Sequence, residues 1–353
     1  MAQGEAKVHF PMRFSKLVMI LTLLGGVALL GGMVWRVGLS GLLESCRAMG
    51  FWLVPYLLLR TVSTLLHAVG WAACFPGPRL PCRFWQLVLI MRAGNAINQV
   101  TPTADIGGEI VRVLLLKPFL PQEQAMAAVV IDKASATMAQ MLYLAFGMLY
   151  LTQFLPLPAA LQVSIALTIG LIIAGVGCFI VLQRYGLLSK SIGWMTLQGW
   201  WPSRLQRFRE PITRLDAQFA TYYVGHPWRF VGALIGHGAA HVFDIVKTYW
   251  LLRFLLGTEA PGWPEAAMVA IAVAALDQML FFVPGRLGTL EGSRFAVLSA
   301  LGVSQIYGLA FGLIARVEHL VWSGLGLLAY AYCTRFFPAD ATCSSTPVTS
   351  ASP

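Results

Sequence analysis

The sequence Asn95-Ala-Ile-Asn-Gln-Val-Thr-Pro-Thr-Ala-Asp-Ile-Gly-Gly-Glu-Ile-Val-Arg112 places eight polar or charged side chains inside an otherwise apolar chain. A second stretch, Pro284-Gly-Arg-Leu-Gly-Thr-Leu-Glu-Gly-Ser-Arg294, has the same skeleton. Both follow the pattern Pro-x6-Glu-x2-Arg, with a glycine between the proline and the glutamate. Ionisable groups are costly inside a bilayer and are usually functional there. We therefore expect the two stretches to form the two halves of one site.

The composition is that of a membrane protein. Of the 353 residues, 58% are hydrophobic and 11% are charged, whereas a soluble domain carries about 25% charged residues. The net charge of +10 comes from basic residues in loops rather than from one basic run. This distribution suits anionic lipid headgroups and does not indicate a nucleic-acid partner. The six cysteines have no C-x-x-C spacing, so we expect free thiols and neither a metal site nor a disulfide framework.

The hydrophobic runs predict the membrane segments. A helix that crosses the hydrocarbon core needs about 20 apolar residues. Six runs meet this length, at 17–37, 51–75, 126–154, 159–183, 228–256 and 305–333. Two further segments, 84–118 and 265–304, begin as apolar helices, are interrupted by the Pro/Gly/Glu motif, and then resume. Irregular backbone at membrane depth is tolerated only where it is buried in protein or lines a wet cavity. The predicted fold class is an all-α polytopic membrane protein with about six full spans and two re-entrant or broken helical hairpins.

The distribution of Lys and Arg predicts the orientation. Basic residues gather in three segments, 1–16, 76–83 and 184–227, whereas the loops on the other side offer little besides Arg47. Basic loops stay in the cytoplasm, so we expect both termini there. The hairpin at 84–118 then begins and ends on the cytoplasmic side, and the hairpin at 265–304 begins and ends on the opposite side. This arrangement is typical of inverted-repeat transporters, whose site lies between the halves near the midplane.

Five parts follow from this organisation: a cytoplasmic N-terminus at 1–16, a first membrane half at 17–183, a cytoplasmic amphipathic segment at 184–227, a second membrane half at 228–333, and a disordered cytoplasmic tail at 334–353. In the amphipathic segment, Leu215, Phe219 and Tyr222 recur at helical spacing among basic residues. We expect a helix that lies on the inner leaflet and is broken at Pro211. The alternative is a cytoplasmic helix packed on the protein.

The charged motif residues are the candidate substrate-binding residues. Glu109 and Arg112 are three residues apart, so they share a helix face if the second half-helix begins there. They could pair with each other, or Arg112 could hold a phosphate that Glu109 orients. Glu291 and Arg294 repeat this spacing, with Arg286 beside them, and we expect the same behaviour there. The alternative is that all these charges form internal ion pairs that stabilise the hairpin tips.

Other polar residues extend the candidate site. Three more are expected to contribute to substrate binding: Asn98, Asp132 and Arg316. The alternatives are that Asn98 satisfies backbone groups freed by the break, and that Asp132 and Arg316 pair between helices or extend toward the interface. His237, His241 and Asp244 have the spacing i, i+4, i+7, which fits a proton path, a polar seam between helices or, least well, a metal face. Arg60, His67 and Asp277 are isolated polar residues in apolar runs and carry the same ambiguity.

Three features together resemble the integral-membrane lysylphosphatidylglycerol synthase/flippase-like family. They are Asn98-Gln-Val-Thr-Pro-x4-Gly-Gly-Glu-x2-Arg112, the pair Asp132-Lys133, and Val283-Pro-Gly-Arg-Leu-Gly-Thr-Leu-Glu-Gly-Ser-Arg294. The likeness covers about residues 15–335. The chain is similar to the flippase half of the bifunctional members and to stand-alone relatives, including the hopanoid-biosynthesis-associated membrane proteins. The soluble aminoacyl-transferase domain of the bifunctional members is missing, so the resemblance does not imply synthesis of a lysyl-lipid.

The resemblance implies a flippase or lipid-trafficking transporter in the bacterial inner membrane. Its partners would be membrane lipids: a phospholipid, an aminoacylated lipid or a hopanoid-type lipid with a polar or anionic headgroup. We do not expect an enzyme or a cofactor, because the chain has no G-x-S-x-G, H-E-x-x-H or P-loop motif. Two alternatives stay open: a membrane subunit or enzyme that acts on a lipid headgroup, and a transporter of small solutes or ions. The sequence does not set the oligomeric state.

Overall fold

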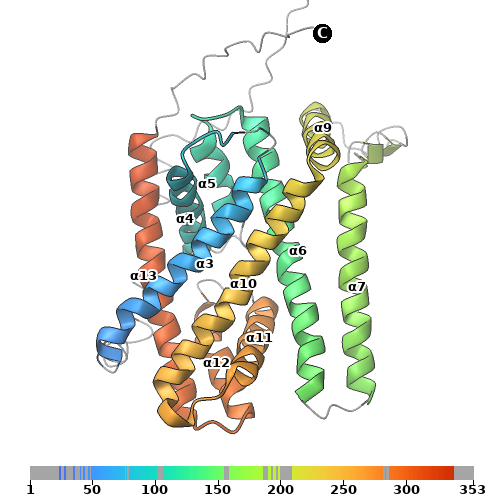
Figure 1. Ribbon diagram of the computed structural model, residues 1–353. Helices are drawn as coiled ribbons and strands as arrows, with labels where there is room; N and C mark the ends of the chain where they lie inside the picture. The colour runs from blue at the N-terminus through green and yellow to red at the C-terminus, as the bar shows by residue number, and fades with distance from the viewer. Residues whose placement is uncertain are drawn as a thin grey trace, which may run out of the picture.

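The computed structural model describes residues 49–75, 77, 79–101, 106–154, 159–185, 209–280, 283 and 286–337, with scattered positions between 24 and 47 and between 190 and 198. Over these residues the chain is built from helices, so the predicted all-α class is confirmed. The helices are α3 (Leu53–Ala73), α4 (Phe84–Val100), α5 (Gly107–Leu116), α6 (Gln122–Phe154), α7 (Ala159–Arg184), α9 (Arg209–Gly225), α10 (Pro227–Leu256), α11 (Trp263–Met279), α12 (Thr289–Ala300) and α13 (Gln305–Phe336), with short 3-10 turns at Gly50–Trp52 and Gly257–Glu259 (Figure 1). The predicted span at 17–37 and most of the predicted tail lie outside the described residues.

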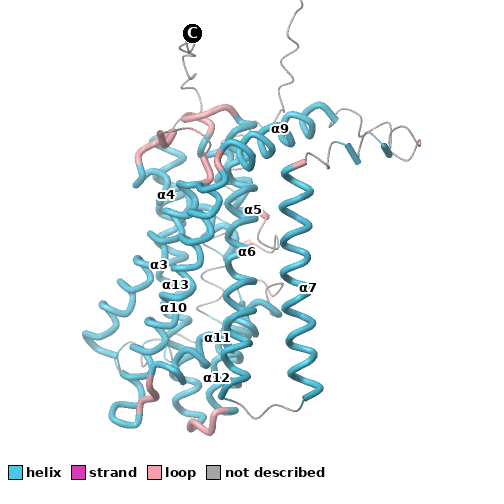
Figure 2. Tube along the Cα trace, turned by 45° about the vertical axis from the view of Figure 1, so that its right-hand side comes forward, coloured by secondary structure: helices cyan, strands magenta, loops and turns pink. Residues whose placement is uncertain are grey.

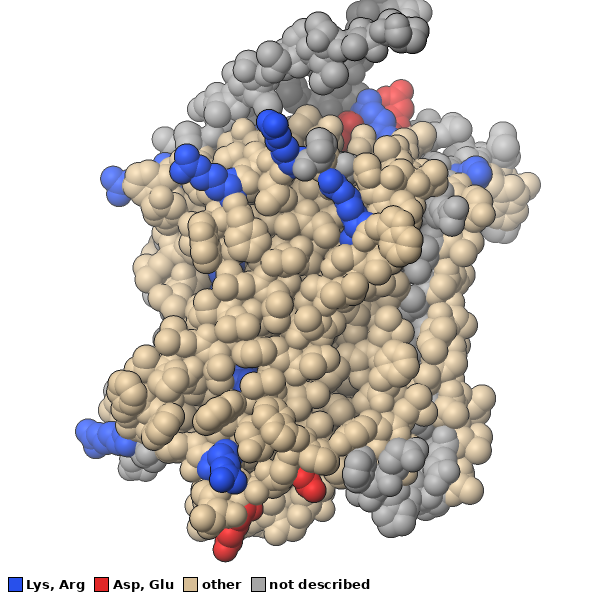
Figure 3. Space-filling model, viewed as in Figure 1, with Lys and Arg blue, Asp and Glu red and all other residues tan. Residues whose placement is uncertain are grey.

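The long helices have the length and surface of membrane helices. Three of the described segments are long and apolar enough to cross a membrane: Gly50–Ala73, Gln122–Thr152 and Gln305–Phe336. Helices α7 and α10 have 26 and 30 residues, so their length also suffices. On the face shown in Figure 3, charged side chains lie mostly at the two ends, and those between them are largely uncharged. This is the surface of a multi-pass membrane protein.

Each of the two motif segments folds as two helices joined by a break. Helices α4 and α5 pack together at one end of the bundle, and α11 and α12 pack together at the other end (Figures 1 and 2). Glycines make the first pair close: a Cβ on Gly94 would lie 2.6 Å from Cγ of Arg112 and 2.8 Å from the carbonyl oxygen of Gly108. Only a residue without a side chain fits at such an approach. Pro102 and Pro284, which the sequence predicts at the breaks, lie outside the described residues.

Helices α3 and α10 pack closely against each other. Their contact also depends on glycine, because a Cβ on Gly236 would lie 2.7 Å from the backbone nitrogen of Gly70. Around this pair, α13 packs against α4 and α12, and α6 packs against α5, α10 and α11. Each hairpin is therefore held by long helices.

Helix α9 packs on the protein at the end of the bundle where α5 ends (Figure 1). The predicted break at Pro211 is wrong within this helix, because Pro211 lies in its first turn, where a proline costs no hydrogen bond. Phe219 and Tyr222 are buried, and the Tyr222 hydroxyl donates to the carbonyl oxygen of Ala73 at 3.0 Å. These contacts favour the alternative of a helix packed on the protein. Residues 199–208 of the predicted amphipathic segment lie outside the described residues.

Candidate functional site

A cavity of about 350 Å³ is lined by residues from both hairpins and from the long helices around them. Among its lining side chains, six are basic and three are acidic: Arg60, Arg112, Lys133, Lys247, Arg286 and Arg294, against Glu109, Asp132 and Glu318. His319 lies near the middle of α13, and His67 and Lys247 lie about two thirds of the way along α3 and α10, so the cavity occupies the middle part of the bundle. A cavity at this depth with an excess of positive charge attracts anions.

Arg112 is the most heavily bonded residue of the first hairpin. Its Nη1 lies 2.9 Å from Oδ2 of Asp132 and 3.3 Å from Oε2 of Glu109, and its Nη2 donates to Oδ1 of Asn95 at 2.5 Å. The pairing of Glu109 with Arg112, one of the two predicted alternatives, is therefore present. Asn98 accepts a hydrogen bond from the backbone nitrogen of Gly108 at 2.5 Å and lines the cavity. It satisfies a donor in the first turn of α5, as helix N-termini require.

In the second hairpin, the motif residues have different partners. Nη1 of Arg294 donates to Oδ1 of Asp277 at 2.7 Å, and Nη1 of Arg286 lies 3.4 Å from the other oxygen of Asp277. Glu291 accepts two hydrogen bonds from Arg316, at 2.5 Å and 2.9 Å. The expected pair of Glu291 with Arg294 is thus replaced by pairs with residues of α11 and α13. Helix α12 lies close against α13 here, because a Cβ on Gly312 would lie 2.8 Å from Cα of Glu291.

The two arginines of the motif nevertheless occupy matching positions. Arg112 on α5 bonds to Asn95 on α4, and Arg294 on α12 bonds to Asp277 on α11. In both cases the partner lies 17 residues earlier, on the first helix of the same hairpin. The arginine therefore ties the two helices of each hairpin together at the same point.

The two glutamates match as well. Glu109 pairs with Lys133 on α6, where Nζ and Oε1 are 3.5 Å apart, and Glu291 pairs with Arg316 on α13. In each copy the basic partner lies on the long helix that follows the hairpin. The repeat in the sequence thus corresponds to a repeat in the ion pairs. Glu291 and Arg316 are not among the residues that line the cavity, and their pair supports its wall.

A second carboxylate centre in the cavity was not identified from the sequence as a site residue. Oε2 of Glu318 accepts a hydrogen bond from the Tyr56 hydroxyl at 2.8 Å, and Oε1 accepts one from Nζ of Lys247 at 2.8 Å. Nε of Arg60 lies 3.9 Å from the same Oε1. These residues come from α3, α10 and α13. The signal in the sequence was the polar group Arg316, Glu318 and His319 inside the apolar run of α13, but the partners of Glu318 on α3 and α10 are too distant in the chain to be recognised.

Of the predicted histidine face, only His237 lines the cavity. Its Nε2 lies 3.1 Å from Oδ1 of Asp132, and its Nδ1 lies 2.9 Å from Nδ1 of His67. His241 stacks on Tyr143, with ring centroids 5.6 Å apart. Asp244, one turn further along α10, lies 3.8 Å from Lys247. Within the described residues, no group of three or more His, Cys, Asp or Glu side chains has a metal-binding arrangement.

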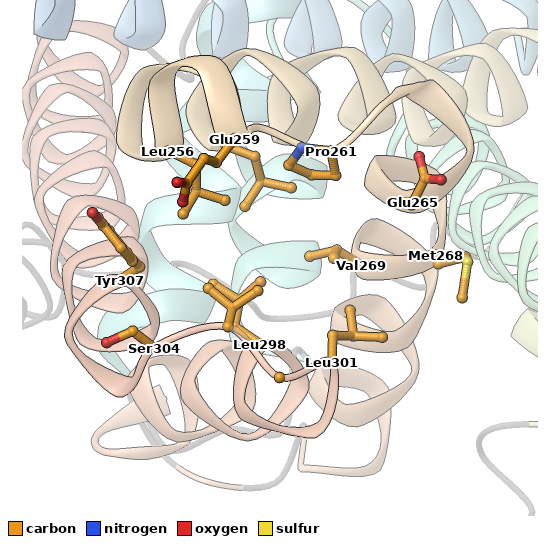
Figure 4. A pocket seen from close by; sticks show the side chains of 13 residues that line it. Leu256, Glu259, Pro261, Glu265, Met268, Val269, Leu298, Leu301, Ser304 and Tyr307 are labelled. Carbon is orange, nitrogen blue, oxygen red and sulfur yellow. The ribbon is translucent and has the colours of Figure 1, made fainter.

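A second cavity, of about 390 Å³, lies between α10, α11, α12 and α13 at the end of the bundle opposite α9 (Figure 4). Its charged lining residues are Glu259 and Glu265, and most of the others are apolar, such as Leu298 and Val269. Its lining includes no Lys or Arg. This acidic cavity would repel an anionic headgroup, so the central cavity is the candidate site.

Comparison with known proteins agrees with the motifs. Residues 18–326 match the family described as the lysylphosphatidylglycerol synthase TM region. Over 314 residues the chain is 21% identical to a UPF0104 membrane protein of Pyrococcus horikoshii, an alignment that covers 83% of this chain and 90% of that protein. No solved structure matches the chain at a significant level. The family predicted from the two motifs is confirmed, and the chain belongs to the lysylphosphatidylglycerol synthase TM region family of membrane proteins.

Proposed function

We propose that the protein moves a lipid with an anionic, phosphate-bearing headgroup between the two leaflets of the membrane, and that it acts as a transporter rather than an enzyme. The observation that carries the proposal is the central cavity, in which basic side chains outnumber acidic ones in the middle part of an apolar bundle. A charged group at the centre of a bilayer costs several kcal/mol or more. A transporter of charged headgroups must supply a polar cavity at that depth, while the acyl chains stay in lipid.

We infer that the two halves form an inverted repeat. The hairpins α4–α5 and α11–α12 lie at opposite ends of the bundle (Figure 1), and their Glu and Arg residues have matching partners. In such repeats, one half moves against the other around a fixed central site, so that the site opens to each side in turn. The excess of Lys and Arg in the loops on the side of α9 supports a cytoplasmic position for that end, in a bacterial inner membrane.

The headgroup phosphate would bind by exchange of partners. Arg112 and Arg294 are each held by a carboxylate, Asp132 and Asp277, through one nitrogen, and a phosphate can replace that carboxylate as the acceptor. Arg286 is the more open contact, because its side chain is 43% exposed. Exchange keeps every arginine paired in the empty and the loaded protein. Neither state then contains an unpaired buried arginine, which would be strongly unfavourable.

The proposal is tested with purified protein in liposomes that contain phosphatidylglycerol with a fluorescent acyl chain. Dithionite quenches only the outer leaflet, so it reports movement between leaflets. We expect Arg294→Gln and Glu109→Gln to slow this movement about 10- to 100-fold, because a hydrogen bond to a charged group contributes roughly 1.5–3 kcal/mol. The matched control is Arg253→Gln, an exposed arginine in the last turn of α10, which should not change the rate.

Two further readouts separate the alternatives. Mass spectrometry of the lipids before and after incubation should show the same species, whereas a new headgroup would indicate an enzyme. A labelled zwitterionic lipid should move more slowly than phosphatidylglycerol, and uptake of solutes or ions without lipid movement would indicate a different kind of transporter. Normal movement of phosphatidylglycerol by both Arg294→Gln and Glu109→Gln would refute the proposed site.

A further inference from the structure

We propose that lipid movement is coupled to proton movement through a relay formed by His67, His237 and Asp132, so that one proton accompanies each anionic headgroup. This inference rests on the function proposed above and adds an energy source to it. The relay differs from the predicted helix face, because two of its three members lie on helices other than α10. Its last member is bonded to Arg112, a proposed contact of the headgroup.

The three side chains form a continuous chain of polar contacts. His67 on α3 lines the cavity, and its Nδ1 lies 2.9 Å from Nδ1 of His237 on α10. On the other side of the ring, Nε2 of His237 lies 3.1 Å from Oδ1 of Asp132 on α6. The side chains of His237 and Asp132 are 2% and 5% exposed. Nε2 of His237 and Oδ1 of Asp132 are both buried and have no aligned hydrogen bond within the described residues, so their 3.1 Å contact is an ion-pair contact in which each is a polar neighbour of the other.

The contacts define one direction of hydrogen bonding in the neutral relay. An Nε2–H on His237 faces the carboxylate of Asp132, so Nδ1 of His237 is the acceptor for an Nδ1–H of His67. A proton that arrives at Nε2 of His67 displaces the Nδ1 proton to His237, and the Nε2 proton of His237 passes to Asp132. One proton has entered, the carboxylate is neutral, and both rings are neutral in their other tautomers. Reversal of these transfers restores the relay.

Arg112 links this proton to the headgroup. Its Nη1 lies 2.9 Å from Oδ2 of Asp132, so a phosphate that takes Arg112 removes the cation beside Asp132. The buried carboxylate would then be uncompensated, and protonation through His237 relieves this. Anion binding at Arg112 therefore favours protonation of Asp132, and by linkage protonation favours anion binding.

Other charged or titratable groups surround the relay: Arg60 and Cys74 on α3, Glu109 on α5, Lys133 and Tyr143 on α6, and His241, Asp244 and Lys247 on α10. His241 is the nearest other imidazole, with its ring centroid 5.3 Å from that of His67 in an edge-on contact. Its stacking on Tyr143 places it beside the relay rather than between two of its members. His241 is therefore a matched control for His237 on the same helix.

The packing of α3 also reserves space for the His237 ring. A Cβ on Gly70 would lie 2.9 Å from Nε2 of His237 and 3.0 Å from two of its ring carbons. Gly70→Ala would therefore displace the ring without removing any titratable group. Gly238 is a matched control, because a Cβ at this position meets nothing within 4 Å.

The test uses the same liposomes, with a pH difference of one unit across the membrane. A proton and a singly charged headgroup that move together carry no net charge. Phosphatidylglycerol should then accumulate about tenfold in the leaflet that faces the more alkaline side, because one pH unit corresponds to a tenfold ratio at equilibrium. A potassium diffusion potential with valinomycin should not change this ratio. Protein-free liposomes at the same pH difference give the baseline.

The variants identify the relay. We expect the accumulation ratio to fall to the baseline in His237→Gln and His67→Gln, whatever their rate of lipid movement, because glutamine forms hydrogen bonds but does not carry a proton. Gly70→Ala should lower the ratio in the same way. His241→Gln and Gly238→Ala should keep the tenfold ratio. Circular dichroism and size-exclusion profiles of each variant show whether it is folded.

The outcomes separate this inference from the proposed function. If the wild-type protein equilibrates phosphatidylglycerol between leaflets but its ratio stays at the baseline, the coupling is refuted and the proposed function stands. The coupling through this relay is also refuted if folded His237→Gln keeps the tenfold ratio. If the wild-type protein does not move phosphatidylglycerol at all, the proposed function itself fails, and the coupling fails with it.

Discussion

The ion pair between Glu291 and Arg316 should hold the second hairpin in place, and its removal should lower the free energy of unfolding. Arg316 is 0% exposed, and it donates two hydrogen bonds to Glu291 and one to the backbone carbonyl of Arg286 at 2.6 Å. Removal of one member of a buried pair leaves the other charge uncompensated, which costs about 3–5 kcal/mol. We therefore expect Glu291→Gln and Arg316→Met each to lower the free energy of unfolding by about this amount.

The double variant Glu291→Gln/Arg316→Met distinguishes a buried pair from two independent residues. It removes both charges, so its free energy of unfolding should fall by less than the sum of the decreases in the two single variants, with a difference of about 2 kcal/mol or more. Unfolding in mixed micelles with increasing SDS measures these free energies, and Arg335→Met, at an exposed position of the same helix, is the control. Losses below about 1 kcal/mol in both single variants, or strict additivity in the double variant, would refute the role of this pair as a support of the cavity wall.

Three other variants test separate parts of the structure. Gly108→Ala places a Cβ against backbone of α4 and should lower the free energy of unfolding in SDS by about 2 kcal/mol or more. In the control Gly292→Ala, the new Cβ meets nothing within 4 Å, so this variant should be neutral or stabilising. Equal stabilities of the two variants would contradict the close approach of α4 and α5. Arg286 has φ of 52°, a backbone conformation that glycine adopts without strain, so Arg286→Gly should keep or raise the stability of the protein. The same variant should slow phosphatidylglycerol movement, because it removes a proposed headgroup contact. A loss of stability without slower movement would contradict the place of Arg286 in the site. Tyr56→Phe removes the hydroxyl that bonds to Glu318 at 2.8 Å and should cost about 1–3 kcal/mol in unfolding, and an unchanged midpoint would show that the contact contributes nothing.

Local spacing in the sequence predicts contacts within one helix better than contacts between helices. The spacing of Glu109 and Arg112 predicted a possible pair, and the pair is present because both residues lie on α5. The same spacing failed for Glu291 and Arg294, because Arg316 offers Glu291 a bidentate partner on another helix. An i, i+3 pattern states which residues share a face, but it does not state what the face meets.

Hydropathy predicted the positions of the helices well for a related reason. Five of the predicted spans coincide with α3, α6, α7, α10 and α13, because a run of apolar residues is a property of the local sequence. The break in each hairpin was also recognisable, since a proline and glycines occur together there between two apolar runs. Hydropathy alone does not give the number of membrane crossings. Helix α10, for example, is long enough to cross a membrane, but it also contains polar residues that line the cavity.

The contacts that the sequence did not indicate join residues that are far apart in the chain. Arg92 is buried in α4, donates to the carbonyl oxygen of Trp322 at 3.1 Å and lies over the indole ring at 4.5 Å. No pattern near Arg92 indicates an acceptor 230 residues away. His67 likewise looked isolated in α3, although it contacts His237. Polar residues in apolar runs predict that a partner exists, and the fold decides which residue it is.

The two half-sites share a skeleton but differ in chemistry, and this difference bears on which half binds the proton. In the first hairpin, the carboxylate that holds Arg112 also faces a histidine. In the second, Asp277 is bonded to two arginines and Ser293, none of which releases or binds a proton near neutral pH. A proton gradient drives transport only where proton binding is linked to substrate binding. Under the proposed coupling, only the first half exchanges its arginine for a proton. Asp277 occupies the position that matches Asn95, whereas Asp132 is a second partner of Arg112 and faces His237, so the proton-binding group belongs to the first half.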